Sequence, residues 1–128
     1  MNRRRAALCG AWLSAAAVVL GAFAAHGLRG RLEPQWLDIF HTGVEYHLLH
    51  AIGLLGVAAV WDLGAERWMR WSATALCLGL LVFSGSLYAL ALTGQRALGV
   101  ITPLGGAGMI VGWILLAIGL RPRRGGRT

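Results

Sequence analysis

The side chains that could support chemistry are concentrated in residues 41–50, within an otherwise apolar run. This segment contains His41, Glu45, Tyr46, His47 and His50. Ionisable groups are costly in a segment long enough to cross a bilayer, so they indicate either a function or a specific hydrogen-bonding partner. An acid beside imidazoles could carry a proton, and two imidazoles on separate helices could ligate a haem.

The polar side chains of this segment form two faces if the segment is a helix with 100° per residue. His41 and Glu45 point in one direction, whereas Tyr46, His47 and His50 lie on the opposite side. These groups therefore cannot all reach one ligand from this helix alone. We expect one face to contact the neighbouring helices and the other to face a partner, headgroups or water.

Polar groups in the other apolar segments are predicted to lie at the same depth, in the outer half of the membrane, while the cytoplasmic half is almost entirely hydrocarbon. The candidate polar cluster comprises His26, His41, Glu45, Tyr46, His50, Ser84, Ser86, Tyr88 and Thr102. Because buried polar groups require partners, the simplest role of this cluster is to tie the helices together.

Glu45 is expected to form a hydrogen bond with His41, with His26 or with a threonine of a neighbouring helix. For His50 we expect a hydrogen bond across helices, to Ser86 or Tyr88. Two alternatives remain open. Glu45 could handle protons together with a histidine, or His26 and His50 could ligate a haem.

No motif for catalysis or metal binding accompanies these residues. The sequence lacks an HExxH zinc motif, a phosphate-binding glycine loop and a nucleophile elbow. Cys9 and Cys77 lie in separate apolar runs and are expected to be reduced packing residues. We therefore predict no catalytic residue, no metal and no cofactor, and the chain is not expected to be an enzyme.

The composition indicates an integral membrane protein with a single domain, residues 1–128. Hydrophobic residues make up 57% of the chain and charged residues only 13%, and the mean hydropathy is +0.63. A soluble domain of this size could not bury so much apolar surface. The net charge of +7 comes from arginines that flank the apolar runs, so it fits anionic lipid and topology signals better than nucleic acid.

Four apolar runs predict an all-α, up-down bundle of four transmembrane helices. The expected helices are about 6–25, 43–61, 71–92 and 105–120, with an interfacial segment at 34–42 and a basic tail at 121–128. The first run, with Ala22, Phe23 and Ala24 at its end, could alternatively be a cleaved signal peptide. Small residues at four-residue spacing, such as Gly85-Ala89-Thr93 and Gly108-Gly112, are expected to form helix contacts.

The distribution of arginine predicts the orientation in the membrane. Of the twelve basic residues, nine lie in the N-terminal flank, the loop 62–70 and the tail, and three lie in the other two connections. The positive-inside rule therefore places both termini in the cytoplasm. Arginines expected to bind anionic headgroups on the cytoplasmic side are Arg3, Arg4, Arg5, Arg121, Arg123 and Arg124.

Several of these segments together resemble one family. They are 21–27, 42–51, the motif Phe-Ser-Gly-Ser-Leu-Tyr at 83–88 and the motif Thr-Pro-Leu-Gly-Gly at 102–106. The chain resembles the YgdD-like inner-membrane family, the domain of unknown function 423 family, which is related to the transmembrane protein 256 family. One departure is His47, where the family usually has glutamine. The resemblance implies a multi-pass protein of the bacterial inner membrane that keeps its first apolar segment, and it supplies no activity.

The leading functional hypothesis is a small accessory or scaffolding component that associates with itself or with a larger membrane complex. The first alternative is a proton-coupled carrier that uses Glu45, His26 and His50. The second alternative is a redox subunit that binds haem or quinone.

Overall fold

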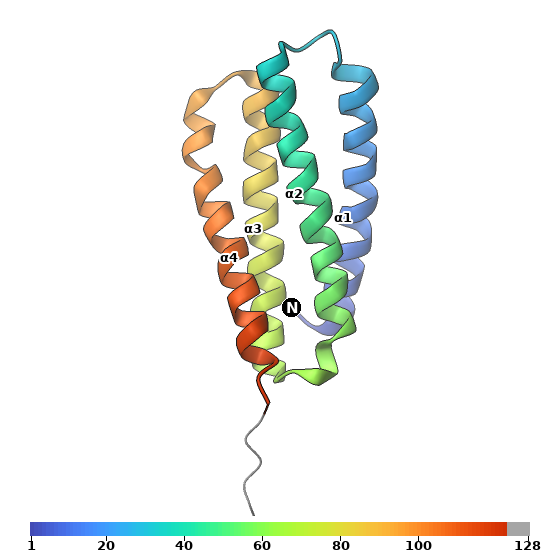
Figure 1. Ribbon diagram of the computed structural model, residues 1–128, viewed down its shortest axis with the longest axis vertical. Coiled ribbons are helices and arrows are strands. Elements are labelled where there is room, and N and C mark those ends of the chain that lie inside the picture. The colour runs from blue at the N-terminus through green and yellow to red at the C-terminus, as the bar shows by residue number, and fades with distance from the viewer. Residues whose placement is uncertain (123–128) are drawn as a thin grey trace, which may run out of the picture.

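Four long helices lie side by side in chain order and run alternately in opposite directions (Figure 1). The computed structural model describes residues 1–122. The long helices are α1 (Arg3–Phe23), α2 (Pro34–Ala59), α3 (Glu66–Thr93) and α4 (Thr102–Gly119), joined by the π-helix η1 (Ala24–Leu28) and the 3-10 helices η2 (Trp61–Leu63) and η3 (Arg96–Val100). The predicted all-helical architecture is confirmed.

The helices begin and end at residues suited to those positions. The side chain of Asn2 accepts a hydrogen bond from the backbone N–H of Arg5, which lets α1 begin three residues earlier than expected. Pro34 occupies the first turn of α2, where its missing N–H is not needed. Gly94 follows the last residue of α3 and adopts φ 69°, the left-handed conformation that glycine tolerates best.

The segment 34–42, predicted as an interfacial segment that leads into the second transmembrane helix, is helical. It forms the first turns of α2, which continues without interruption to Ala59. No proline or other helix-breaking sequence separates Pro34 from the apolar part of the helix, so the helix propagates through it.

Three helical segments are long and apolar enough to cross a membrane: Arg3–Leu28, Glu66–Thr93 and Arg96–Gly119. The helix α2 is also long, with 26 residues, but it does not belong to this group. Its acidic residues and its three histidines lower its hydropathy.

The α3–α4 contact depends on direct approach of the two backbones. A Cβ atom added to Gly79 on α3 would lie 2.6 Å from the Met109 nitrogen on α4. A Cβ atom added to Gly112 would lie 2.9 Å from the Leu76 nitrogen. Small residues allow such approach between membrane helices. Gly112 was expected to act in this way, whereas Gly85 is exposed and has no neighbouring atom near its would-be Cβ.

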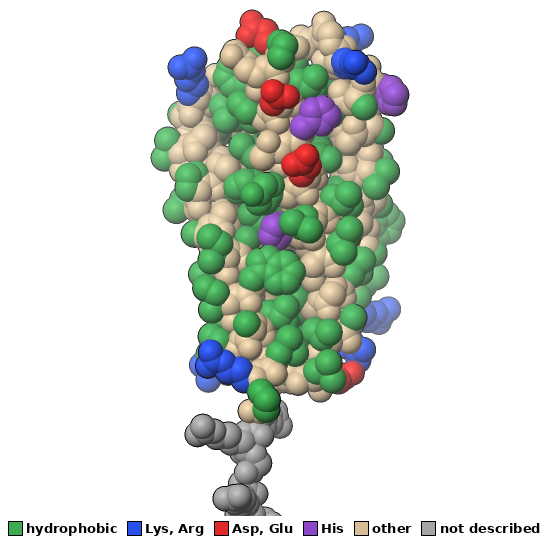
Figure 2. Space-filling model, in the orientation of Figure 1, with side chains coloured by type: hydrophobic (Ala, Val, Ile, Leu, Met, Phe, Trp, Pro, Cys, Tyr) green, Lys and Arg blue, Asp and Glu red, His purple; other side chains and the backbone are tan. Residues whose placement is uncertain are grey.

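The two outer helices each pack on one main neighbour. α1 packs mainly on α2, where Gly10 approaches the Ala51 backbone, and α4 packs mainly on α3. The buried core between the helices contains Leu54, Met69 and Leu76. One side of α1 and one side of α4 therefore stay uncovered. On the face drawn in Figure 2, the arginines lie toward the two ends, and hydrophobic side chains occupy much of the middle.

Candidate functional site

A hydrogen bond between His47 and Tyr88 joins the two central helices. The Nδ1 atom of His47 on α2 lies 2.9 Å from the Tyr88 hydroxyl on α3. His47 is only 6% exposed. Gly43 makes this contact possible, because a Cβ atom at that position would lie 2.8 Å from the Tyr88 ring. The ring of Phe40 packs on the ring of Tyr88, with 4.8 Å between the two ring centroids.

Two further hydrogen bonds extend this polar site across the bundle. The buried Ser84 hydroxyl donates to the Gly43 carbonyl oxygen at 2.8 Å, which links α3 to α2. The hydroxyls of Ser86 and Thr102 lie 2.6 Å apart and link α3 to the start of α4. Of the predicted polar cluster, Ser86 and Thr102 thus contact each other, whereas Ser84 and Tyr88 bind Gly43 and His47, which were not assigned to it. We call Gly43, His47, Ser84 and Tyr88 the α2–α3 tie.

His47 is the member of the tie that sequence reasoning missed. It was set aside because the family usually has glutamine there. The buried residues of α2 nevertheless recur at alternating three- and four-residue spacing: Phe40, Gly43, His47, His50, Leu54 and Val57. This period is the signal for the face of a helix that contacts other helices. Applied to residues 40–57, it would have identified His47 as a contact residue.

His50 does not form the expected bond to Ser86 or Tyr88. Its Nδ1 lies 2.9 Å from the carbonyl oxygen of Tyr46, one turn earlier in the same helix. Its ring stacks on the Tyr46 ring, with 5.8 Å between the centroids and 8° between the ring planes. It also contacts the Trp113 ring of α4, at a centroid distance of 6.0 Å. His50 lies about 24 Å along α2 from Pro34, past the midpoint of the helix.

Glu45 does not form the predicted hydrogen bond to His41, His26 or a threonine. Its side chain is exposed, and within residues 1–122 it has no hydrogen bond or ion pair. His26 is also exposed, in η1 at the end of α1. His41 is half-buried and has no side-chain hydrogen bond in that range. The acid and these two imidazoles therefore do not assemble with His50 into one site.

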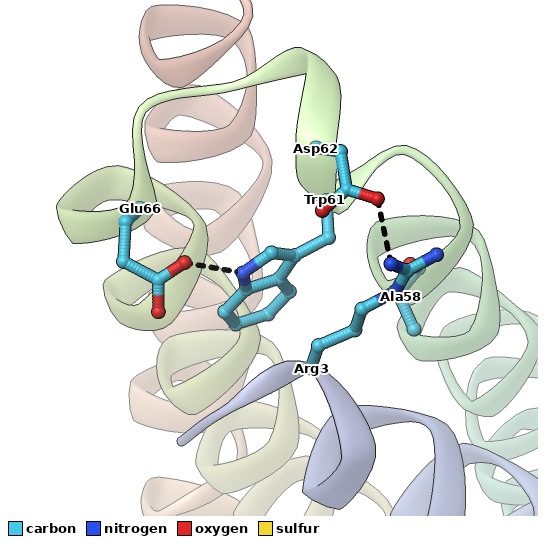
Figure 3. A network of polar contacts seen from close by, with 5 residues as sticks. All are labelled: Arg3, Ala58, Trp61, Asp62 and Glu66. Atoms are coloured by element: carbon cyan, nitrogen blue, oxygen red, sulfur yellow. Dashed lines mark hydrogen bonds and ion pairs between the residues drawn. The ribbon is translucent and has the colours of Figure 1, made fainter.

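The half of the bundle next to η2, which was predicted to be almost entirely hydrocarbon, also contains a buried polar contact between helices. The Ser72 hydroxyl on α3 is fully buried and donates to the Gly112 carbonyl oxygen on α4 at 2.8 Å. At the end of the bundle that carries η2, Arg3 donates to Asp62 at 2.6 Å and to the Ala58 carbonyl oxygen at 3.1 Å (Figure 3). Hydrogen bonds between helices are thus present along the whole bundle.

The arginines assigned to headgroups differ in their surroundings. Arg3 is already paired with Asp62, so its guanidinium is only partly available to a lipid. Arg4, Arg5 and Arg121 are exposed at the same end of the bundle. Arg123 and Arg124 lie outside the described residues.

The chemistry that the α2–α3 tie can perform is limited by its enclosure. The Nε2 atom of His47 is buried and has no hydrogen-bond partner within the described residues. An apolar cavity of about 160 Å³ lies beside it, lined by His47, Leu80, Leu81, Ser84, Gly85 and Tyr88. No group of three metal-ligating side chains occurs in residues 1–122. The geometry of these residues fits a structural contact better than a ligand site.

Comparison with known proteins gives a consistent group of relatives. The family model described as protein of unknown function (DUF423) matches residues 20–106. The chain is 45% identical to the UPF0382 membrane protein YwdK of Bacillus subtilis, over 80% of this chain and 84% of that protein. It is 41% identical to the UPF0382 inner membrane protein YgdD of Escherichia coli, over 85% and 84% of the two chains. No solved structure matches.

Proposed function

The chain belongs to the family of proteins of unknown function DUF423, and from that premise we propose that it is an accessory or scaffolding component with no catalytic activity of its own. It is a multi-pass protein of the bacterial inner membrane. In this role, the polar residues hold the bundle together. The uncovered surface of α1 binds another membrane protein or a second copy of the chain.

We propose that α2 is a fourth span and that both termini lie in the cytoplasm. α2 is antiparallel to both α1 and α3 and packs along them (Figure 1). Its most polar buried groups, His47 and His50, face protein and not lipid, which reduces the cost of placing them in a membrane. The excess of arginine at the end with the N-terminus and η2 supports this orientation.

The hydrogen bonds and backbone contacts of the bundle support a rigid platform. The α2–α3 tie, the Ser72 bond to Gly112 and the Gly79 contact with α4 each bind neighbouring helices at a buried position. Close backbone contacts and interhelical hydrogen bonds are the main sources of helix association in lipid. Relative movement of α2, α3 and α4 would break several of them at once.

The observation that carries the proposed association is the position of Trp12. Its side chain is 76% exposed, and it lies about 14 Å along α1, roughly a third of the way along the span Arg3–Leu28. Tryptophan normally lies at the membrane surface, where its ring nitrogen is near water. Leu8, Ala15 and Val19 lie on the same face of α1 and are also exposed. We call these four residues the α1 face.

The carrier and haem alternatives have weaker support. Both require His26 and His50 at similar depth, whereas His26 lies at the far end of α1 and His50 lies past the midpoint of α2. The carrier also requires Glu45 near them, and this side chain is exposed without a partner in the described range.

Affinity capture tests the proposal directly. A chain with one tag is expressed together with a copy that has a second tag, and the detergent extract is captured through the first tag. The proposal predicts recovery of the second tag or of a stoichiometric membrane protein. Recovery of the first chain alone, as a monomer, would contradict the proposed function.

A further inference from the structure

We propose that the end of the bundle next to η2 holds a binding site for an anionic phospholipid, with its phosphate at Arg67 and Arg70 and an acyl chain along α3. None of these residues belongs to the α2–α3 tie or to the α1 face. The inference therefore goes beyond the proposed association and concerns a different ligand and a different surface.

A cavity of about 430 Å³ provides the space for the headgroup. It is lined by Met1, Glu66, Arg67, Arg70, Trp71 and Thr74. Small-molecule pockets typically have volumes of about 300–1,000 Å³, so this cavity is large enough for a phosphate and its substituent. Arg67, Arg70 and Thr74 lie at three- and four-residue spacing near the start of α3, so they share one face of the helix.

The charges around the cavity favour an anion because the cations that line it outnumber the acids. The Asp62 carboxylate binds Arg3 at 2.6 Å, and the Glu66 carboxylate accepts a hydrogen bond from Nε1 of Trp61 at 2.6 Å (Figure 3). Within residues 1–122, neither Arg67 nor Arg70 has an ion pair. The cavity is thus lined by three cations, the Met1 ammonium, Arg67 and Arg70, against the single carboxylate of Glu66. The Arg67 guanidinium also lies over the Trp68 ring, 5.3 Å from its centroid.

The hydroxyl of Thr74 is not available to donate to a phosphate. It donates to the Arg70 carbonyl oxygen at 2.8 Å and accepts a hydrogen bond from the Met1 ammonium at 3.2 Å. The phosphate would therefore be held by Arg67 and Arg70, whose planar groups suit bidentate binding of phosphate oxygens.

The surface that continues from the cavity argues for a lipid and not for a soluble anion. Trp71, 59% exposed, lies at the mouth of the cavity, where an aromatic ring suits the membrane surface. Leu78 and Leu81 follow on the same face of α3 and are exposed. From Arg67 to Leu81 this face extends about 21 Å. Leu81 also lines the apolar cavity beside His47, so an acyl chain has a continuous apolar path.

Native mass spectrometry of the full chain, with phosphatidylglycerol or phosphatidylcholine added, tests the site. The wild-type chain should retain one phosphatidylglycerol under conditions that remove phosphatidylcholine. The double variant Arg67→Gln/Arg70→Gln should bind phosphatidylglycerol about 30-fold more weakly, since each arginine beside an anionic headgroup contributes to binding. A circular dichroism spectrum equal to that of the wild type shows that the variant is folded.

The control is Arg29→Gln/Arg31→Gln, which removes the same charge from two exposed arginines outside the cavity, in the α1–α2 connection at the opposite end of the bundle. This variant should retain phosphatidylglycerol like the wild type. Equal losses in the two double variants would show general attraction to a basic surface and would overturn the site.

Two further measurements separate a lipid from a soluble phosphate. Phosphatidylglycerol with a photoreactive acyl chain should crosslink to the wild-type chain within residues 71–81. Millimolar glycerol phosphate or inorganic phosphate should not displace the lipid. Displacement by either anion, or crosslinks confined to other helices, would contradict the assignment to a phospholipid.

Discussion

The Tyr88 hydroxyl on α3 lies 2.9 Å from Nδ1 of His47, which is buried between α2 and α3. This contact accounts for an imidazole within an apolar segment without requiring catalysis. The hydroxyl partners one ring nitrogen, and the same two helices are joined by the Ser84 bond to Gly43. Polar groups in the bundle thus supply specific contacts that apolar side chains cannot provide in lipid.

Removal of the Tyr88 hydroxyl should weaken the α2–α3 contact. Tyr88→Phe leaves both ring nitrogens of His47 without a partner, and we expect the free energy of unfolding to fall by about 0.6–1.7 kcal/mol, the range for interhelical hydrogen bonds in membranes. Unfolding in mixed micelles measures this change. Tyr46→Phe is the control, because within residues 1–122 the Tyr46 hydroxyl has no hydrogen bond. Equal effects of the two variants would contradict the role of the tie.

A methyl group at Gly79 should separate α3 from α4. Its Cβ would lie 2.6 Å from the Met109 nitrogen, and a backbone atom cannot move away cheaply. We expect Gly79→Ala to lower the free energy of unfolding by about 1–3 kcal/mol. Gly85→Ala, on the exposed side of the same helix, should be neutral or stabilise by up to about 1 kcal/mol. A neutral result for Gly79→Ala would show that the helices do not approach this closely.

The orientation of the bundle can be tested with two cysteines at opposite ends. Leu63 in η2 and Val100 in η3 are each 76% exposed. In a chain with Cys9→Ala and Cys77→Ala, an impermeant maleimide added to intact cells should label Val100→Cys and not Leu63→Cys. An Arg31→Cys variant should also be labelled if α2 crosses the membrane. Labelling of Leu63→Cys alone would reverse the proposed topology.

Loss of the Glu45 charge should have little effect. The side chain is exposed and has no partner in the described range, so we expect Glu45→Gln to change the free energy of unfolding by less than about 0.5 kcal/mol. Proton flux in liposomes should be the same for the variant and the wild type. A pH-dependent flux that requires Glu45 would instead support the carrier hypothesis. Glu66→Ala is the positive control for stability, because it removes the acceptor of the Trp61 hydrogen bond.

The sequence was sufficient to predict the helical class, the membrane setting and the family, because these depend on long apolar runs and on residue order. It was less informative about α2. Hydropathy placed the start of this helix at residue 43, whereas Pro34 and the absence of a breaker let the helix begin nine residues earlier. Nor did it reveal that His50 would bind the Tyr46 carbonyl oxygen in its own helix and contact Trp113 of α4, in place of the expected partners Ser86 and Tyr88.

Side-chain partners were predicted only where spacing determines them. Ser86 and Thr102 were both assigned to the polar cluster, but their mutual contact depends on the close approach of α3 and α4 at Gly79 and Gly105. The pairing of Ser84 with a backbone carbonyl leaves no sequence signature, since any residue supplies such an acceptor. His47 could have been found from the three- and four-residue spacing of the buried positions on α2.

If the α1 face binds a partner, the complex extracted from native membranes should have a mass above that of one chain, which size-exclusion chromatography with light scattering measures. The wild-type chain should run well above its monomer mass of 13.6 kDa. Trp12→Ala should shift it to the monomer, whereas Leu104→Ala, which removes an equally exposed side chain from α4, should leave the complex intact. A wild-type chain that runs as a monomer, or a Trp12→Ala variant with the wild-type mass, would contradict the account.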